Sequence, residues 1–138
     1  MGTSLTLMRW LDLYATGIEK LDRQHESLTD LLNALNESYR GNKPRDVLLF
    51  RLDQLIEAVH AHFTDEEIMM KERGYPDLDL HKSEHDFLLS QAAHFREEFA
   101  SEKVALTESM MDYLRDWLRD HILISDRRMA RFLKGDAS

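Results

Sequence analysis

The sequence predicts an all-α fold, an antiparallel up-down-up-down four-helix bundle with an N-terminal arm. Two observations predict it: four long segments repeat apolar residues at helical spacing, and only three short breaks separate them. Short connections make successive helices antiparallel neighbours. A length of 138 residues suits one domain, so we expect 1–138 to form a single domain, with 1–18 as the arm and 19–134 as the bundle.

The first two helices are predicted from leucine spacing and from the residues that end them. They are expected at about 19–39 and 44–72. Gly41 lies in the break between them, and Pro44 suits the first turn of a helix. Gly74 and Pro76 favour a turn after the second helix. The apolar face of the first helix is expected to consist of Leu21, Leu28, Leu31, Leu32 and Leu35.

The third and fourth helices are expected at about 79–100 and 105–133. The inward residues of the third are predicted to be Phe87, Leu88, Gln91, Phe95 and Phe99. Those of the fourth are predicted to be Met110, Tyr113, Leu114, Trp117, Leu118 and Ile122. Residues 1–18 lack clear periodicity, but Trp10, Leu13 and Tyr14 indicate an arm that packs on the bundle.

Composition and charge exclude several classes of protein. A formal charge of −8 without a long basic stripe argues against a nucleic-acid partner. The absence of cysteine excludes thiolate nucleophiles and cysteine-ligated metals. No apolar run approaches the roughly 20 residues that a membrane span needs, and residues 1–9 are too short and polar for a signal peptide. We expect a cytoplasmic protein with no membrane insertion.

Histidines and carboxylates recur at one level of the predicted bundle. His62 and Glu66 are four residues apart, as are His81 and His85, so each pair shares a helix face. Counting residues from the breaks at 1.5 Å per residue places the candidates of all four helices roughly 22–27 Å from one end of the bundle. The candidate metal ligands are His25, His62, Glu66, His81, His85, His121 and Asp126.

Five imidazoles and two carboxylates are too many ligands for one tetrahedral zinc ion. They suit two ions of intermediate softness, each bound by two or three histidines and bridged by both carboxylates. With a hydroxide as a third bridge, one position of a six-coordinate pair stays open for a small diatomic ligand.

One spacing departs from this simple arrangement. His121 and Asp126 are five residues apart, which is about 140° around a regular α-helix. Both can face the centre only if the helix is irregular. We therefore predict an i→i+5 irregularity between His121 and Arg127.

The chain resembles the bacterial hemerythrins from Trp10 to about Phe132. The motifs that carry the resemblance are Gln24-His25, His62-Phe63-x-x-Glu66, Tyr75-Pro76, His81-x-x-x-His85-x-Phe87 and Trp117-Leu118-x-x-His121 with Asp126. The resemblance implies an oxygen-binding protein rather than an enzyme. It implies reversible O2 binding at a non-haem di-iron centre, for oxygen storage, delivery or sensing.

The resemblance also implies a role for each residue. His81, His85 and His121 would hold one iron, and His25 and His62 the other. Glu66 and Asp126 would bridge the two iron ions (Fe2+/Fe3+), together with an oxo or hydroxo group. The iron with two histidines would keep the open position. The implied O2 pocket consists of Leu28, Phe63, Trp117, Leu118 and Ile122.

Alternative functions remain at this stage. The same centre would serve an O2 or redox sensor module cut from a larger signalling protein, or a di-iron enzyme that handles peroxide or nitric oxide. A ferritin-like oxidase would need two Glu-x-x-His motifs, and only Glu57-x-x-His60 fits, on the wrong face. His60 and His94 are expected to face outward, and of the acidic run 65–67 only Glu66 is expected to turn inward.

Overall fold

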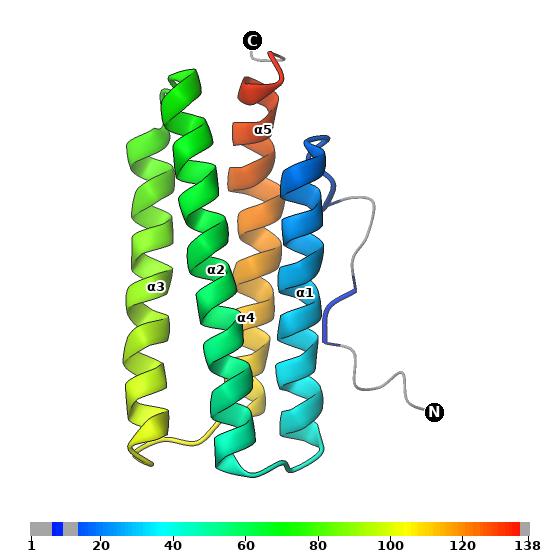
Figure 1. Cartoon of the computed structure of the whole chain (residues 1–138), viewed down its shortest axis with the longest axis vertical. Coiled ribbons are helices and arrows are strands. Elements are labelled where there is room, and N and C mark those ends of the chain that lie inside the picture. The colour runs from blue at the N-terminus through cyan, green and yellow to red at the C-terminus, as the bar shows by residue number, and fades with distance from the viewer. Residues whose placement is uncertain (1–6, 10–13, 136–138) are drawn as a thin grey trace.

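A computed structural model describes residues 7–9 and 14–135, and within them the chain forms an antiparallel helical bundle (Figure 1). The elements are α1 (Glu19–Arg40), α2 (Arg45–Arg73), α3 (Leu78–Ala100), α4 (Glu108–Asp120), the π-helical segment η3 (His121–Asp126) and α5 (Arg127–Leu133). The last three follow one another without a break and form the fourth helix of the bundle. The up-down-up-down architecture predicted from the sequence is confirmed.

Local signals explain where the helices begin and end. Gly74 adopts a left-handed conformation (φ 68°) and donates its backbone N–H to the carbonyl oxygen of Lys71, and the N–H of Tyr75 donates to that of Met70. The fourth helix begins at Glu108, three residues later than predicted. The reason is a cap, because the side chain of Thr107 accepts a hydrogen bond from the backbone N–H of Met110 at 3.2 Å.

The apolar core has two parts, which lie on either side of a polar layer. The larger part fills the half of the bundle that contains the α1–α2 and α3–α4 connections, and its buried residues include Leu28, Leu32, Leu35, Leu52, Leu55, Phe99, Met111 and Leu118. The smaller part closes the opposite end, with Leu21, Met70, Tyr75, Met129 and Leu133. The polar layer between them consists of the candidate metal ligands.

The predicted inner face of the third helix is wrong at two positions. Phe87 is 57 % exposed and Gln91 is also exposed, whereas Leu88 is buried. Adjacent helical residues point about 100° apart, so Phe87 and Leu88 do not both face the core. Tyr113, predicted to face inward on the fourth helix, is 42 % exposed.

The segment before α1 packs on the bundle where the structure describes it. Asn33 of α1 accepts hydrogen bonds from the backbone N–H groups of Leu7 and Met8 and donates one to the carbonyl oxygen of Met8. Tyr14 is buried in the larger core. Trp10 and Leu13, the other two predicted arm residues, lie outside the described residues. Among the described helices, none is long and apolar enough to cross a membrane.

Candidate metal centre

All seven ligand candidates meet in the polar layer and are buried, none more than 6 % exposed. Their donor atoms form two groups that are compatible with metal ions. The first group contains Glu66, His81, His85, His121 and Asp126, and the second contains His25, His62, Glu66 and Asp126. Both carboxylates therefore belong to both groups.

The three-histidine group gathers around one oxygen of each carboxylate. His85 Nε2 lies 3.1 Å from Glu66 Oε1, and His121 Nε2 lies 3.1 Å from Asp126 Oδ1. His81 Nε2 lies 3.0 Å from Asp126 Oδ1 and 3.3 Å from Glu66 Oε1. The Nε2 atoms of His85 and His121 are 3.2 Å apart, so all three rings direct the same nitrogen towards one point.

The two-histidine group uses the other oxygen of each carboxylate. His25 Nε2 lies 2.9 Å from Asp126 Oδ2 and 3.6 Å from Glu66 Oε2. His62 Nε2 lies 2.9 Å from Glu66 Oε2. Each carboxylate thus directs one oxygen to each group, the arrangement expected of a carboxylate that bridges two cations.

The irregularity predicted in the fourth helix is confirmed, and it explains how that helix supplies two residues to the layer. Residues His121–Asp126 form a π-helix, which widens one turn so that positions five apart share a face. As a result both His121 and Asp126 are buried in the centre.

The electrostatics of the layer favour positive charge between the carboxylates. Burial lowers the pKa of His25 and His81, but Asp126 and Glu66 outweigh it and raise the pKa of each to about 9. Burial also lowers the pKa of His121, but the same carboxylates and Glu84 raise it to about 10. Burial raises the pKa of Glu66 and Asp126, and the surrounding imidazoles more than reverse this shift. Both carboxylates are therefore ionised and need cationic neighbours.

Several buried atoms in the layer fit a bound metal pair better than a hydrogen-bond network. Within the described residues, His62 Nε2, Glu66 Oε2 and both carboxylate oxygens of Asp126 make no hydrogen bond. Imidazole nitrogens nevertheless lie about 3 Å from these oxygens. Lone pairs of nitrogen and oxygen therefore face the same point, and no N–H group is directed at the oxygens. Metal cations at the two convergence points would satisfy them.

Three further side chains contact the outer nitrogens of the histidines, and the sequence analysis did not identify them. Gln24 Oε1 lies 2.6 Å from His62 Nδ1, Glu67 Oε2 lies 2.9 Å from His85 Nδ1, and Glu84 Oε1 lies 3.2 Å from His121 Nδ1. The prediction that Glu67 belongs to a solvated face is therefore wrong. Each of the three directly precedes a ligand candidate or directly follows one, and this adjacency is the signal that sequence reasoning missed.

The aromatic residues predicted for the O2 pocket stack on the histidines. Phe63 is parallel to His85, with ring centroids 3.7 Å apart, and Trp117 is nearly parallel to His121 at 4.6 Å. Leu28, Leu118 and Ile122 are buried as expected. Of the five predicted pocket residues, Trp117 and Leu118 line a cavity of about 40 Å³ beside the layer.

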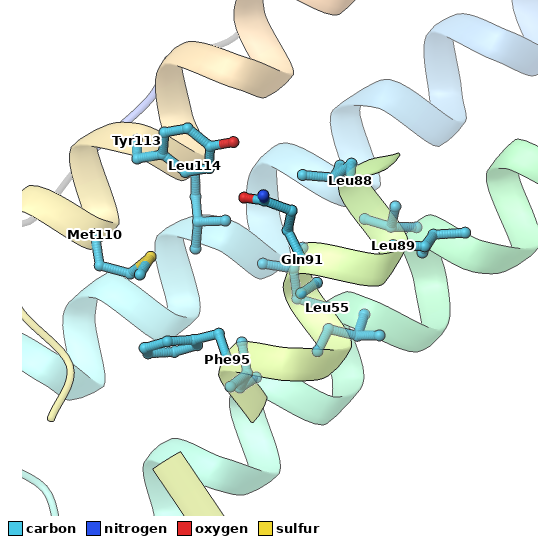
Figure 2. A pocket seen from close by; sticks show the side chains of 12 residues that line it. Leu55, Leu88, Leu89, Gln91, Phe95, Met110, Tyr113 and Leu114 are labelled. Carbon is cyan, nitrogen blue, oxygen red and sulfur yellow. The ribbon is translucent and has the colours of Figure 1, made fainter. Parts of the chain in front are cut away.

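A larger cavity of about 90 Å³ adjoins this one, and side chains of α2, α3 and α4 converge on it (Figure 2). The two cavities share Leu55, Val59, Leu88 and Leu114. Apolar side chains dominate both linings.

The remaining histidines of the described residues lie outside the layer. His60 and His94 are both exposed, as predicted. Glu57, the partner of His60 in the one ferritin-like motif, is exposed as well, so this motif contributes nothing to the centre.

Comparison with known proteins agrees with this geometry. The sequence model of the Hemerythrin HHE cation binding domain matches residues 16–133. The chain is 33% identical over 120 residues to a bacteriohemerythrin of Methylococcus capsulatus, covering 86% of this chain and 90% of the relative. It is 30% identical over 118 residues to a myohemerythrin of Theromyzon tessulatum, covering 86% and 87%.

Solved structures give the same result. A crystal structure of wild-type hemerythrin superimposes with a TM-score of 0.87 at 31% identity, covering 92% of this chain and 98% of the other. A structure of a hemerythrin L114A variant superimposes equally well, with a TM-score of 0.87 at 30% identity over 93% of this chain and 98% of the other. Fold, donor set and sequence agree, and the chain belongs to the hemerythrin family.

Proposed function

We propose that this protein binds O2 reversibly at a non-haem di-iron centre, for oxygen storage, delivery or sensing. One observation carries the proposal: two buried groups of imidazole nitrogens share two carboxylates, each of which directs one oxygen to each group. When bound, the iron pair supplies electrons to O2 and recovers them when O2 leaves.

The geometry supports a specific assignment of the ligands. His81, His85 and His121 would hold one iron, His25 and His62 would hold the other, and Glu66 and Asp126 would be shared between them. The group with fewer histidines would leave room for O2. This assignment follows the two donor groups that the fold brings together.

The apolar side of the layer supports binding rather than catalysis. The cavity of about 40 Å³ that Trp117 and Leu118 line has aliphatic and aromatic side chains around it, without a carboxyl or an ammonium group. A dry pocket without an acid slows the delivery of protons to bound O2 and so favours its release unchanged. Five histidines against two carboxylates also distinguish the layer from the carboxylate-rich ferritin-like centres. We therefore propose that the protein is not an enzyme.

A visible spectrum tests the function directly. Reduced, iron-loaded protein should develop a charge-transfer band when air is admitted and lose it when O2 is removed, with about two irons per chain. Iron that oxidises without a reversible band would overturn the proposal in favour of redox or peroxide chemistry. A chain that binds no iron after anaerobic reconstitution would overturn it altogether.

A matched pair of variants tests the assignment. His62→Ala removes a ligand from the two-histidine group and should lower the iron content, whereas His94→Ala changes an exposed histidine and should leave it unchanged. Equal iron loss from both variants would contradict the assignment.

A further inference from the structure

The outer nitrogens of the histidines meet two different kinds of partner. In the three-histidine group, Nδ1 of His85 lies 2.9 Å from a carboxylate oxygen of Glu67, and Nδ1 of His121 lies 3.2 Å from one of Glu84. Both partners are anionic. Ser125 donates a hydrogen bond of 2.6 Å to the same oxygen of Glu84, which fixes this carboxylate in place.

At His62 of the two-histidine group the partner is a neutral amide. Nδ1 of His62 lies 2.6 Å from Gln24 Oε1. The amide of Gln24 cannot turn over, because its nitrogen donates a hydrogen bond of 2.8 Å to Asp65 Oδ2. Its oxygen therefore faces the ring, so the imidazole donates from Nδ1 and presents Nε2 to the centre.

The chemical nature of the outer partner changes the strength of a histidine ligand. A carboxylate that accepts the Nδ1–H proton orients the ring and raises its basicity, and it also adds negative charge near the metal. An amide oxygen orients the ring equally well but adds no charge, and hydrogen bonds to charged groups are roughly twice as strong as neutral ones. His85 and His121 thus differ from His62 in the charge of the outer partner, and the two groups also differ in the number of histidines.

We propose that the charge of these outer partners makes the three-histidine group hold its metal ion more tightly than the two-histidine group. Glu67 and Glu84 act as positioning residues that raise the metal affinity of the three-histidine group. Gln24 adds no charge, so the two-histidine group releases its ion first. The inference rests on the proposed function, since it assumes two ions held by these groups. It assigns a role to three residues that are not themselves ligands.

The carboxylates of Glu67 and Glu84 differ in how far they are exposed to solvent. The side chain of Glu67 is 24 % exposed and lies closer to its imidazole, whereas that of Glu84 is 40 % exposed and lies farther away. Solvent screens a charge more strongly at an exposed position. Loss of charge at Glu67 should therefore have the larger effect.

Metal release tests the ranking without reference to O2. Anaerobic protein loaded with ferrous iron is mixed with a ferrous chelator, and release should occur in a fast and a slow phase of one iron each. Glu67→Gln keeps the shape and hydrogen-bonding capacity but removes the charge, and should accelerate the slow phase about 10- to 100-fold. Glu84→Gln should accelerate it less.

A charge-neutral exchange tests the other group. The double variant Gln24→Glu with Asp65→Asn moves the carboxylate onto His62 and keeps a hydrogen bond between the two positions and the net charge. It should slow the fast phase. Glu98→Gln is the control, because it neutralises a carboxylate on the same helix as Glu84, 3.5 Å from the exposed His94, and should change neither phase.

The outcomes separate the inference from the proposed function. Equal release from Glu67→Gln and Glu98→Gln, or equal acceleration of both phases, would overturn the inference and leave the di-iron centre intact. Fewer than two irons bound by the unchanged chain would overturn both. The reduction potential gives a second measure, since loss of charge at Glu67 should raise it, and a merely structural role would not.

Discussion

The leucine-rich half of the bundle and the layer of ligand candidates are built from the same four helices, yet they bury side chains of opposite kinds. In the leucine-rich half, side chains such as Leu32 and Leu35 are buried without polar partners and need none. In the layer, five imidazoles and two ionised carboxylates are equally buried and balance one another only in part. The leucine-rich half is therefore stable by packing alone, whereas the layer depends on added positive charge.

Removal of metal should have the largest effect. Metal that binds only the folded chain stabilises it by about 4 kcal/mol at a thousand times its Kd. Chelation of both irons should therefore lower the free energy of unfolding by at least this amount, measured by denaturant titration of loaded and metal-free protein. Unchanged stability would show that the layer needs no cation.

Truncation in the leucine-rich half should come next. Leu35 is completely buried, and Leu35→Ala should cost about 2–5 kcal/mol because it leaves a cavity. The iron count should stay at that of the unchanged chain, since the layer is separate from this part of the core. Loss of iron in this variant would show that the two regions are not independent.

The pH dependence of stability should distinguish the layer from the leucine-rich half in metal-free protein. The pKa values of His25 and His81 are about 9 in the folded chain, against about 6.5 when unfolded. Folded protein then binds more protons, so this contribution is complete below pH 6.5 and is lost as pH rises towards 9. Unfolding titrations between pH 6.5 and 9 should show a loss of about 1.4 kcal/mol per pH unit for each extra proton.

Iron-loaded protein is the control for this pH response, because its imidazoles hold metal instead of protons. Metal-free stability that rises with pH over the same range would contradict the electrostatic description of the layer.

The smallest effect is expected from a surface ion pair beside the leucine-rich half. Arg96 of α3 contacts both carboxylate oxygens of Asp53 of α2, at 2.9 and 3.0 Å, and its hydrogen bonds lower the pKa of Asp53. Because the pair is partly exposed, Arg96→Gln should lower the free energy of unfolding only slightly at neutral pH. The difference should disappear as pH falls and Asp53 is protonated, as acid titration of both proteins would show.

Regular periodicity explains which parts of the fold were predictable from sequence. The predicted helix bounds lie within three residues of the observed ones, because leucine spacing and Gly74 mark them locally. The seven candidates were found because residue counts along antiparallel helices convert directly into height. Even the π segment could be predicted, since a spacing of five residues from His121 to Asp126 does not fit an α-helix that directs both inward.

Features set by side-chain direction were not predictable in the same way. Phe87 looked like a core residue by type, but its neighbour Leu88 occupies the inner face. Gln24, Glu67 and Glu84 are polar residues of ordinary kind, and only the three-dimensional structure shows which oxygen reaches which ring. Sequence pattern therefore locates a centre better than it locates the residues that surround it.

The π turn acts as a phase shift in the fourth helix. Met111 and Leu118 are buried upstream of it, and Met129 and Leu133 are buried downstream, where they belong to the smaller core. Deleting one residue here, for example the exposed Ile124, would rotate one part by about 100° relative to the other. Such a helix could direct inward either its ligand candidates or Met129 and Leu133. The one additional residue of the π turn allows both sets to face the bundle.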